Sequence, residues 1–150
     1  MSRTDDRWPV ALAALRLGTR VIEEIQTGVK AAGFGDVTPL HGFAFARIAA
    51  GDATTADLAE HLGVTKQAAA QLTERLVQAG YVSRSAHPRD SRARLLILTP
   101  RGRACTEAAR AAAETAVERW REELPPIDVG HFESALLAIT ASIPILRPPT

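Results

Sequence analysis

The middle of the chain changes its hydrophobic period within a few residues, and this change constrains the fold more than any other feature. Two short segments with helical spacing, 54–63 and 65–80, meet at the turn HLGVT. Directly after them, residues 81–82 and 95–98 have the composition of two short strands, with turn-forming residues between them. Two helices joined by a tight turn predict a helix-turn-helix, and the hairpin that follows predicts its winged version.

Capping residues indicate where the two short helices begin and end. Thr54 precedes the first helix, and Asp57 follows three residues later, which is a weak form of a capping box. Gly63 ends this helix, because a residue free to adopt positive φ suits the position after a helix. Thr65 can cap the second helix, and Gly80 ends it. The predicted buried faces comprise Leu58, Ala59 and Leu62 in the first helix, and Ala68 or Ala69, Leu72, Leu76 and Val77 in the second.

Further helices are predicted on both sides of this unit. One begins at Trp8 and stops before Gly33, and another begins at Pro39 after the capping residue Thr38. A long alanine-rich helix follows residues 99–100, the prolines at 125–126 break it, and a last helix covers about residues 128–143. The fold class is therefore mainly α with a small β-hairpin wing.

The formal net charge of +1 conceals an uneven distribution. Residues 65–103 contain 8 Lys/Arg and 2 Asp/Glu, which gives this segment a charge of +6. Residues 1–64 carry −2 and residues 104–150 carry −3. A basic segment between two mildly acidic ones favours a polyanionic partner for the middle of the chain, although charge alone fits an ordinary solvated surface equally well.

The second short helix carries residue types that read DNA bases. A recognition helix packs one face on its own domain and offers hydrogen-bonding groups to base edges from the other. Lys66 can donate to guanine, and Gln67 and Gln71, four residues apart on one face, can each pair with adenine. An ordinary solvated helix face has a similar composition. The candidate DNA contacts on this helix are Thr65, Lys66, Gln67, Gln71 and Arg75, interspersed with Ala70 and Glu74.

The hairpin offers a second candidate contact with DNA. Its tip carries Arg89, Arg92 and Arg94, which only Asp90 opposes. Guanidinium groups suit phosphates and the narrow minor groove, so this tip and the recognition helix would hold DNA at two points. We expect Asp90 to orient one guanidinium and to steady the turn. The alternative is a charged turn whose arginines only keep it solvated.

Two stretches of the sequence resemble the multiple-antibiotic-resistance regulator (MarR) family. TTADLAEHLGVTKQAAAQLTERLVQAGYVSR is similar to the family's helix-turn-helix, and the resemblance extends over about residues 8–143. PRDSRARLLILTPRG is similar to its wing signature, with the skeleton Asp90, Arg92, Leu98, Thr99 and Gly102. The resemblance implies a homodimeric winged-helix transcription regulator, usually a repressor. In such proteins DNA is released when a small, often anionic aromatic ligand binds, or when a cysteine is oxidised.

The helices outside the winged part predict a homodimer. We expect a single domain over residues 1–150, with the winged part at about 36–100 and dimerisation helices at about 8–35 and 101–146. Their apolar side chains exceed what a winged unit of about 90 residues can cover, so a twofold partner would bury them. Such a dimer would recognise a pseudo-palindromic DNA site. The side chains are Leu12, Leu15, Ile22, Ile25, Phe132, Leu136, Ile139 and Ile143.

A small-molecule site is predicted beside the second helix, which in the family helps to line the ligand pocket. His41 or Arg16 could pair with an anionic ligand, and Phe45 could contact an aromatic one. The alternative is that the aromatic residues of this helix belong to the core. Cys105, a lone cysteine among alanines, fits a small core residue better than a redox sensor, since the family's sensors usually place their cysteine in the N-terminal part.

Other classes of function find no support in the sequence. The four histidines share no metal-ligand spacing, no motif for a cofactor or for catalysis occurs, and no run of 18 apolar residues could span a membrane. We therefore expect no metal, no cofactor and no enzymatic activity. A single cysteine excludes an internal disulfide and fits a cytoplasmic protein. The chief alternative function is a winged-helix adaptor that binds proteins without binding DNA, but an adaptor would not need an arginine-rich wing.

Overall fold

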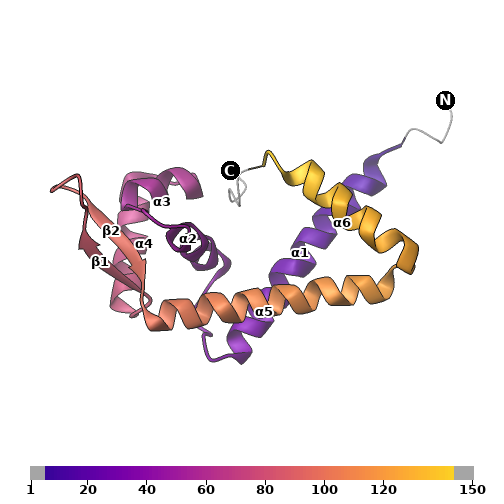
Figure 1. Cartoon of the computed structure of the whole chain (residues 1–150), viewed down its shortest axis with the longest axis horizontal. Helices are drawn as coiled ribbons and strands as arrows, with labels where there is room; N and C mark the ends of the chain where they lie inside the picture. Colours follow the sequence, from indigo (N-terminus) through magenta and orange to yellow (C-terminus); the bar gives the residue numbers. More distant parts are fainter. Residues whose placement is uncertain (1–5, 144–150) are drawn as a thin grey trace.

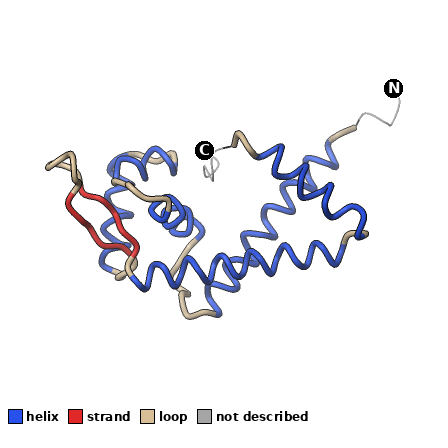
Figure 2. The backbone as a smooth tube through the Cα atoms, viewed as in Figure 1, coloured by secondary structure: helices blue, strands red, loops and turns tan. Residues whose placement is uncertain are grey.

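The computed structural model describes residues 6–143, which form six helices and one two-stranded antiparallel hairpin. The winged part lies at one end of the molecule, α1 and α6 lie at the other, and α5 runs between them (Figure 1). The predicted mainly helical fold with a β-hairpin wing is thereby confirmed. The hairpin lies at the end of the molecule opposite α6 (Figure 2). The elements are α1 Trp8–Ala31, α2 Pro39–Ala49, α3 Thr55–Leu62, α4 Lys66–Gln78, β1 Val82–Ala86, β2 Arg94–Leu98, α5 Pro100–Glu123 and α6 Pro126–Thr140.

Capping contacts account for the helix starts in the winged part. The backbone N–H of Thr54 donates to the carboxylate of Asp57 at 2.7 Å, and the backbone N–H of Asp57 donates to the Thr54 hydroxyl at 3.3 Å. This is a complete capping box, more than the weak form that the sequence predicts. Thr65 caps α4, and Gly63 ends α3 with a φ of 65°, as predicted.

Two elements differ in length from the prediction. The last helix begins at Pro126 and not near residue 128, because proline fits the first helical position, where no backbone donor is needed. It also ends earlier, at Thr140. Strand β1 extends to Ala86 because every residue from Val82 to Ala86 has a partner on β2, with Val82 opposite Leu98 and Ala86 opposite Arg94.

A third segment holds the hairpin against the helices. The backbone N–H of Leu96 donates to the carbonyl of Ala53 at 2.7 Å, and the two residues form an isolated antiparallel bridge. Because Ala53 immediately precedes the cap of α3, this bridge ties β2 to the start of the helix-turn-helix. The wing is therefore anchored through the middle of β2, while its tip projects beyond the helices (Figure 1).

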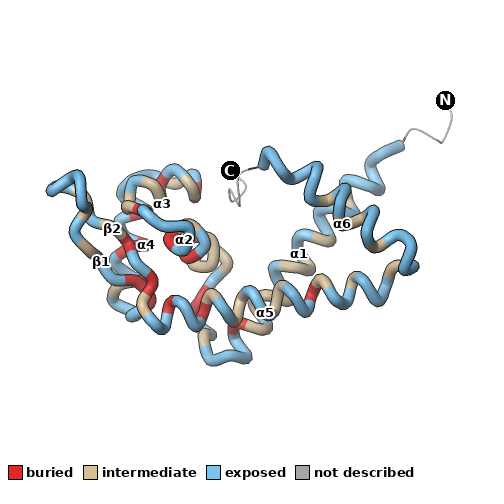
Figure 3. Tube along the Cα trace, viewed as in Figure 1, coloured by how far each residue is buried: buried red, intermediate tan, exposed pale blue. Residues whose placement is uncertain are grey.

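The buried core lies in the winged part and along the crossing of α1 with α5 (Figure 3). The predicted inner faces of α3 and α4 are buried except for Val77, which is half-buried, and Ala69 rather than Ala68 lies on the inner side of α4. Thr73 is also buried on α4, and its hydroxyl donates to the Ala69 carbonyl at 2.8 Å, which satisfies its hydrogen-bonding capacity inside the core.

Helices α1 and α5 cross at a small-residue contact. A Cβ at Gly28 would collide with the Cβ of Ala112, so the absence of a side chain permits the close approach. Beyond the crossing, the guanidinium of Arg20 donates two hydrogen bonds to Glu123, at 2.7 and 3.0 Å. Helix α6 contains no buried residue. Among the helices of residues 6–143, none is both long and apolar enough to cross a membrane.

Candidate nucleic-acid interface

Helix α4 presents all of its predicted DNA-contact residues to solvent. Its inner face packs on the winged core through Leu72 and Leu76, which directs the opposite face outward. The Thr65 hydroxyl accepts the backbone N–H of Ala68 at 3.1 Å, so this side chain caps the helix. The exposed residues of the outer face include Thr65, Lys66, Gln67, Gln71 and Arg75.

An ion pair connects this outer face to the hairpin. Glu74, the one acidic residue on the face, accepts a hydrogen bond from the guanidinium of Arg84 on β1 at 2.9 Å and one from the Gln78 amide at 3.2 Å. The hydrogen bond from Arg84 lowers the pKa of the Glu74 carboxyl. Arg84 thus offsets the negative charge that would repel phosphates. The sequence did not predict this pair, since it forms only when β1 lies along α4.

The wing tip exposes Arg89 and Arg92, and Arg94 stands exposed at the start of β2. Asp90 contacts the main chain: its carboxylate accepts the backbone N–H of Arg92 at 2.9 Å. A second acceptor, which the sequence analysis missed, is the ring of His87. Its Nδ1 lies 3.1 Å from the backbone nitrogens of both Arg89 and Asp90. Two side-chain acceptors therefore shape the turn that carries the arginines.

A cluster of polar contacts around Tyr81 joins three segments of the chain. The Tyr81 hydroxyl donates to the carboxylate of Asp36 at 2.7 Å and accepts a hydrogen bond from Arg101 at 3.1 Å. The Tyr81 hydrogen bond lowers the pKa of Asp36, and burial together with Asp36 raises the pKa of Tyr81. The tyrosine ring packs on Phe45 and Phe34, with centroids 5.4 and 6.2 Å apart. The cluster links the α1–α2 connection, the exit of α4 and the start of α5.

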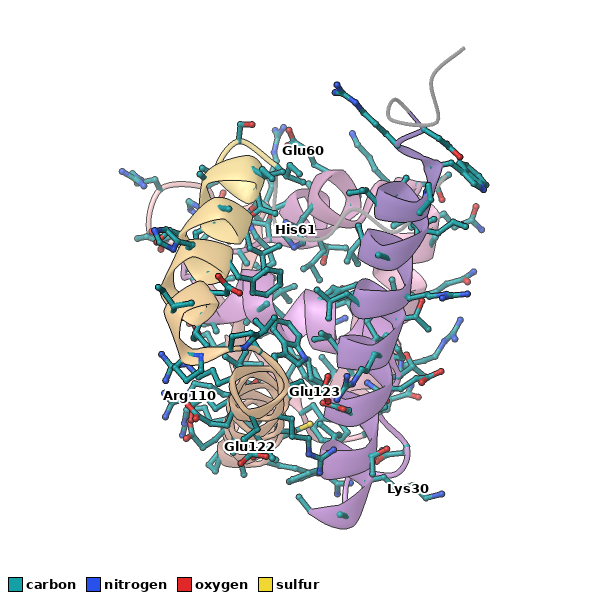
Figure 4. The ribbon with its side chains drawn as sticks, turned by 90° about the vertical axis from the view of Figure 1, so that its right-hand side faces the viewer. Lys30, Glu60, His61, Arg110, Glu122 and Glu123 are labelled. Atoms are coloured by element: carbon teal, nitrogen blue, oxygen red, sulfur yellow. The ribbon has the colours of Figure 1, made fainter. Side chains whose placement is uncertain are left out.

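A cavity of about 370 Å³ lies where α1, α2 and α5 meet. Its walls are almost entirely apolar and include Ile25, Val29, Phe43 and Phe45. Polar groups come from Gln26, Thr106 and Arg110, the last of which is labelled on α5 in Figure 4. This composition suits an apolar or aromatic molecule with few polar groups.

The three predicted effector residues do not meet in this cavity. Phe45 lines it, whereas Arg16 and His41 do not. Arg16 is exposed on α1, six residues and therefore about 9 Å along the helix before Ile22 at the cavity wall. The His41 ring accepts the backbone N–H of Thr38 at 3.3 Å and so caps α2, and burial lowers its pKa.

Cys105 also lines the cavity, but it is buried, with 1% of its surface exposed. Burial raises the pKa of its thiol to about 11, so the reactive thiolate is disfavoured. The expectation that Cys105 is a small core residue is confirmed. Within residues 6–143, no three His, Cys, Asp or Glu side chains gather in a group that could hold a metal ion.

Residues 36–93, which contain α2 to the wing tip, match the model of the MarR family. The winged part of the chain is therefore similar to the MarR family. No curated protein sequence matches it significantly.

Solved structures share this fold over most of the chain. The RV1404 protein of Mycobacterium tuberculosis shares 24% identity at a TM-score of 0.78, over 100% of this chain and 99% of that one. Wild-type MarR of E. coli in its apo form shares 20% identity at a TM-score of 0.69, over 87% and 96%. The MarR family protein RV2887 of Mycobacterium tuberculosis, solved in complex with salicylic acid, shares 26% identity at a TM-score of 0.64, over 87% and 96%. The fold is that of MarR-family transcription regulators and supports a DNA-binding regulator.

Proposed function

We propose that this protein is a sequence-specific regulator that binds a pseudo-palindromic operator in double-stranded DNA as a homodimer and represses transcription. The observation that carries the proposal is the pairing of an uncrowded polar face on α4 with an arginine-rich wing beside it. On α4, Lys66 would donate to guanine, and Gln67 and Gln71 would read adenine in the major groove. Arg89 and Arg92 would contact the backbone or the adjacent minor groove.

The exposed apolar side chains of α1 and α6 support the homodimer. Leu15 is 67% exposed and Ile139 is 72% exposed, and neither has a covering element in a single chain. Burying such a side chain contributes about 1.5–3 kcal/mol, so a twofold partner would stabilise both helices. None of the eight side chains expected at the interface is fully buried. Residues 144–146 of the proposed dimerisation segment lie outside the described residues.

The apolar cavity supports relief of repression by a small aromatic ligand. It lies between the helices proposed for dimerisation and the winged part, so an occupant could change the spacing of the two recognition helices. The related RV2887 was solved with salicylic acid, a small aromatic acid. In this chain, Arg110 is the charged residue at the wall, and its guanidinium already contacts Glu107 and Glu114 at 2.8 and 3.1 Å. The lining therefore favours the aromatic body of a ligand over its charge.

A gel shift with DNA selected by the protein itself tests the proposal against the adaptor alternative. The wild-type protein should retain one sequence family of duplexes over random DNA, and Lys66→Ala should weaken binding. Lys30→Ala is the matched control, because it removes the only other lysine, which lies on α1 outside the winged part (Figure 4). If the wild-type protein retains no duplex at low salt, the result favours the adaptor alternative.

The wing is tested by the salt dependence of the same binding reaction. Arg92→Ala should weaken binding to all sequences alike and reduce the slope of log affinity against log salt by about one contact. An unchanged slope would remove Arg92 from the interface.

A further inference from the structure

His87 stands at the entrance of the wing loop, one residue after the end of β1. Its ring Nδ1 is within hydrogen-bonding distance of two backbone N–H groups, those of Arg89 and Asp90, at 3.1 Å each. Because a backbone N–H can only donate, Nδ1 must supply a lone pair. The geometry therefore requires a neutral imidazole with its proton on Nε2.

Few other contacts shape the turn between the two strands. Pro88 has no backbone N–H to donate and restricts its own φ. The Asp90 carboxylate accepts the N–H of Arg92 at 2.9 Å, and the Asp90 carbonyl accepts the N–H of Ala93 at 3.2 Å. The backbone donors of Arg89 and Arg92 are thus both held by side-chain acceptors. The direction in which these two arginines leave the main chain depends on His87 and Asp90.

We propose that neutral His87 is a positioning residue for the wing, and that protonation of its ring releases the wing tip and weakens binding to DNA. The inference rests on the proposed DNA-binding function and adds a pH response to it. An imidazolium carries N–H on both nitrogens, so Nδ1 would face two backbone donors with a donor of its own. Imidazole side chains change charge between about pH 5 and pH 8, where the other groups of a wing of this composition keep theirs.

Charged groups of both signs lie near the His87 ring. One of them is Asp57 at the start of α3: the hydrogen bond from Thr54 lowers the pKa of this carboxyl, and the charge of Arg47 lowers it further. The others are the Asp90 carboxylate and the arginines of the wing, Arg89, Arg92 and Arg94.

Protonation would also add one positive charge near the DNA phosphates. That gain equals about one contact, whereas the loop that protonation disrupts positions two arginines, Arg89 and Arg92. We therefore expect the loss of order to exceed the gain in charge, so that binding weakens as the pH falls.

Two substitutions of His87 distinguish the effect of its hydrogen-bond acceptor from the effect of its ring volume. In His87→Asn, the amide oxygen can accept the same backbone N–H groups and does not titrate, whereas His87→Ala offers no acceptor. The affinity of each variant for a duplex selected by the wild-type protein is measured by fluorescence anisotropy from about pH 8 to about pH 5.5 at constant ionic strength. Urea unfolding of each variant verifies that it is folded.

At about pH 8 the wild type and His87→Asn should bind alike, and His87→Ala should bind about fivefold more weakly, the loss expected for about one net hydrogen bond. As the pH falls, the wild type should approach His87→Ala while His87→Asn stays level. The other histidines are common to all three proteins, so the difference between wild type and His87→Asn reports on His87 alone. The inference is overturned if His87→Asn binds DNA as weakly as His87→Ala. It is also overturned if the affinities of the wild type and His87→Asn change with pH in the same way.

A second readout needs no DNA. In the free protein, the NMR amide resonances of Arg89 and Asp90 should titrate together with the His87 ring, and those of Arg84 on β1 should not. Wing amides that ignore the ring would overturn the inference even where DNA binding stands. If the wing amides titrate with the ring but the protein binds no duplex at about pH 8, the proposed function is overturned, and the DNA part of this inference is overturned with it.

Discussion

Replacing Tyr81 with Phe should destabilise the protein while leaving its packing intact. The phenyl ring keeps the contacts with Phe45 and Phe34, and Arg101 remains 4.6 Å above the ring centroid. What is lost is the hydroxyl that donates to Asp36 at 2.7 Å and accepts from Arg101 at 3.1 Å. A hydrogen bond to a charged group contributes about 1.5–3 kcal/mol. The Asp36 side chain is 52% exposed, so solvent reduces the expected cost to about 1–2 kcal/mol.

This cost should depend on pH in one direction only. Asp36 has a lowered pKa in the folded state because Tyr81 donates to it, so its contribution to stability is fully present above the pKa of the unfolded chain, about 3.9. The contribution is lost as the pH falls through the lowered folded pKa. The difference in unfolding free energy between wild type and Tyr81→Phe should therefore be largest near neutral pH and should shrink below about pH 4.

Thermal and urea unfolding at equal protein concentration measure the effect, since the midpoint of a dimer depends on concentration. At neutral pH the expected loss lowers the melting temperature by about 2–8 °C for a chain of this length. Asp36→Asn is the control: in that background, Tyr81→Phe should cost less, which gives a coupling energy of about 1 kcal/mol. An equal cost in both backgrounds, or a cost that does not change with pH, would refute the role assigned to this pair.

Three further predictions concern DNA reading, the dimer and the cavity. Gln71→Ala should relax the sequence preference at one symmetric pair of operator positions by about 1–3 kcal/mol in a selection experiment, and a uniform loss over all sequences would make Gln71 a positioning contact instead. The wild type should sediment at about twice 16.1 kDa, whereas Ile139→Asp should shift it towards the monomer; a dimer that tolerates this charge would exclude α6 from the interface. Ala109→Phe should fill part of the 370 Å³ cavity and so block binding of aromatic acids by calorimetry while DNA binding persists, and undiminished ligand affinity would move the site elsewhere.

Local rules predicted most of the fold. Each helix start in the winged part follows from a threonine whose hydroxyl accepts a backbone N–H three residues later, a contact that needs no other segment of the chain. The α-helical period likewise identified which faces of α3 and α4 are inside, because residues three and four apart share a face in any helix. The exposed positions Lys66, Gln67 and Gln71 follow from the same rule.

Contacts between distant segments could not be predicted in this way. Arg84 meets Glu74 because β1 lies along α4. Tyr81 meets Asp36 across 45 residues of sequence, in a cluster to which α2 contributes Phe45 and α5 contributes Arg101. The role of the His87 ring as a hydrogen-bond acceptor was not predicted either, because it depends on the path of the loop after Pro88. In each case the residue type is visible in the sequence, but its partner is not.

The cavity shows the difference most clearly. The sequence by itself determined that α2 carries aromatic residues and that Arg16 lies on the preceding helix. Which of these residues line a cavity depends on where two helices cross. That crossing occurs where Gly28 lets α5 approach α1 beside Ala112, which places Ile25, Phe45 and Cys105 around the cavity and leaves Arg16 well outside it. Helical periodicity specifies the direction of a side chain around its axis, whereas only the packing of one helix against another decides which stretch of that axis is covered.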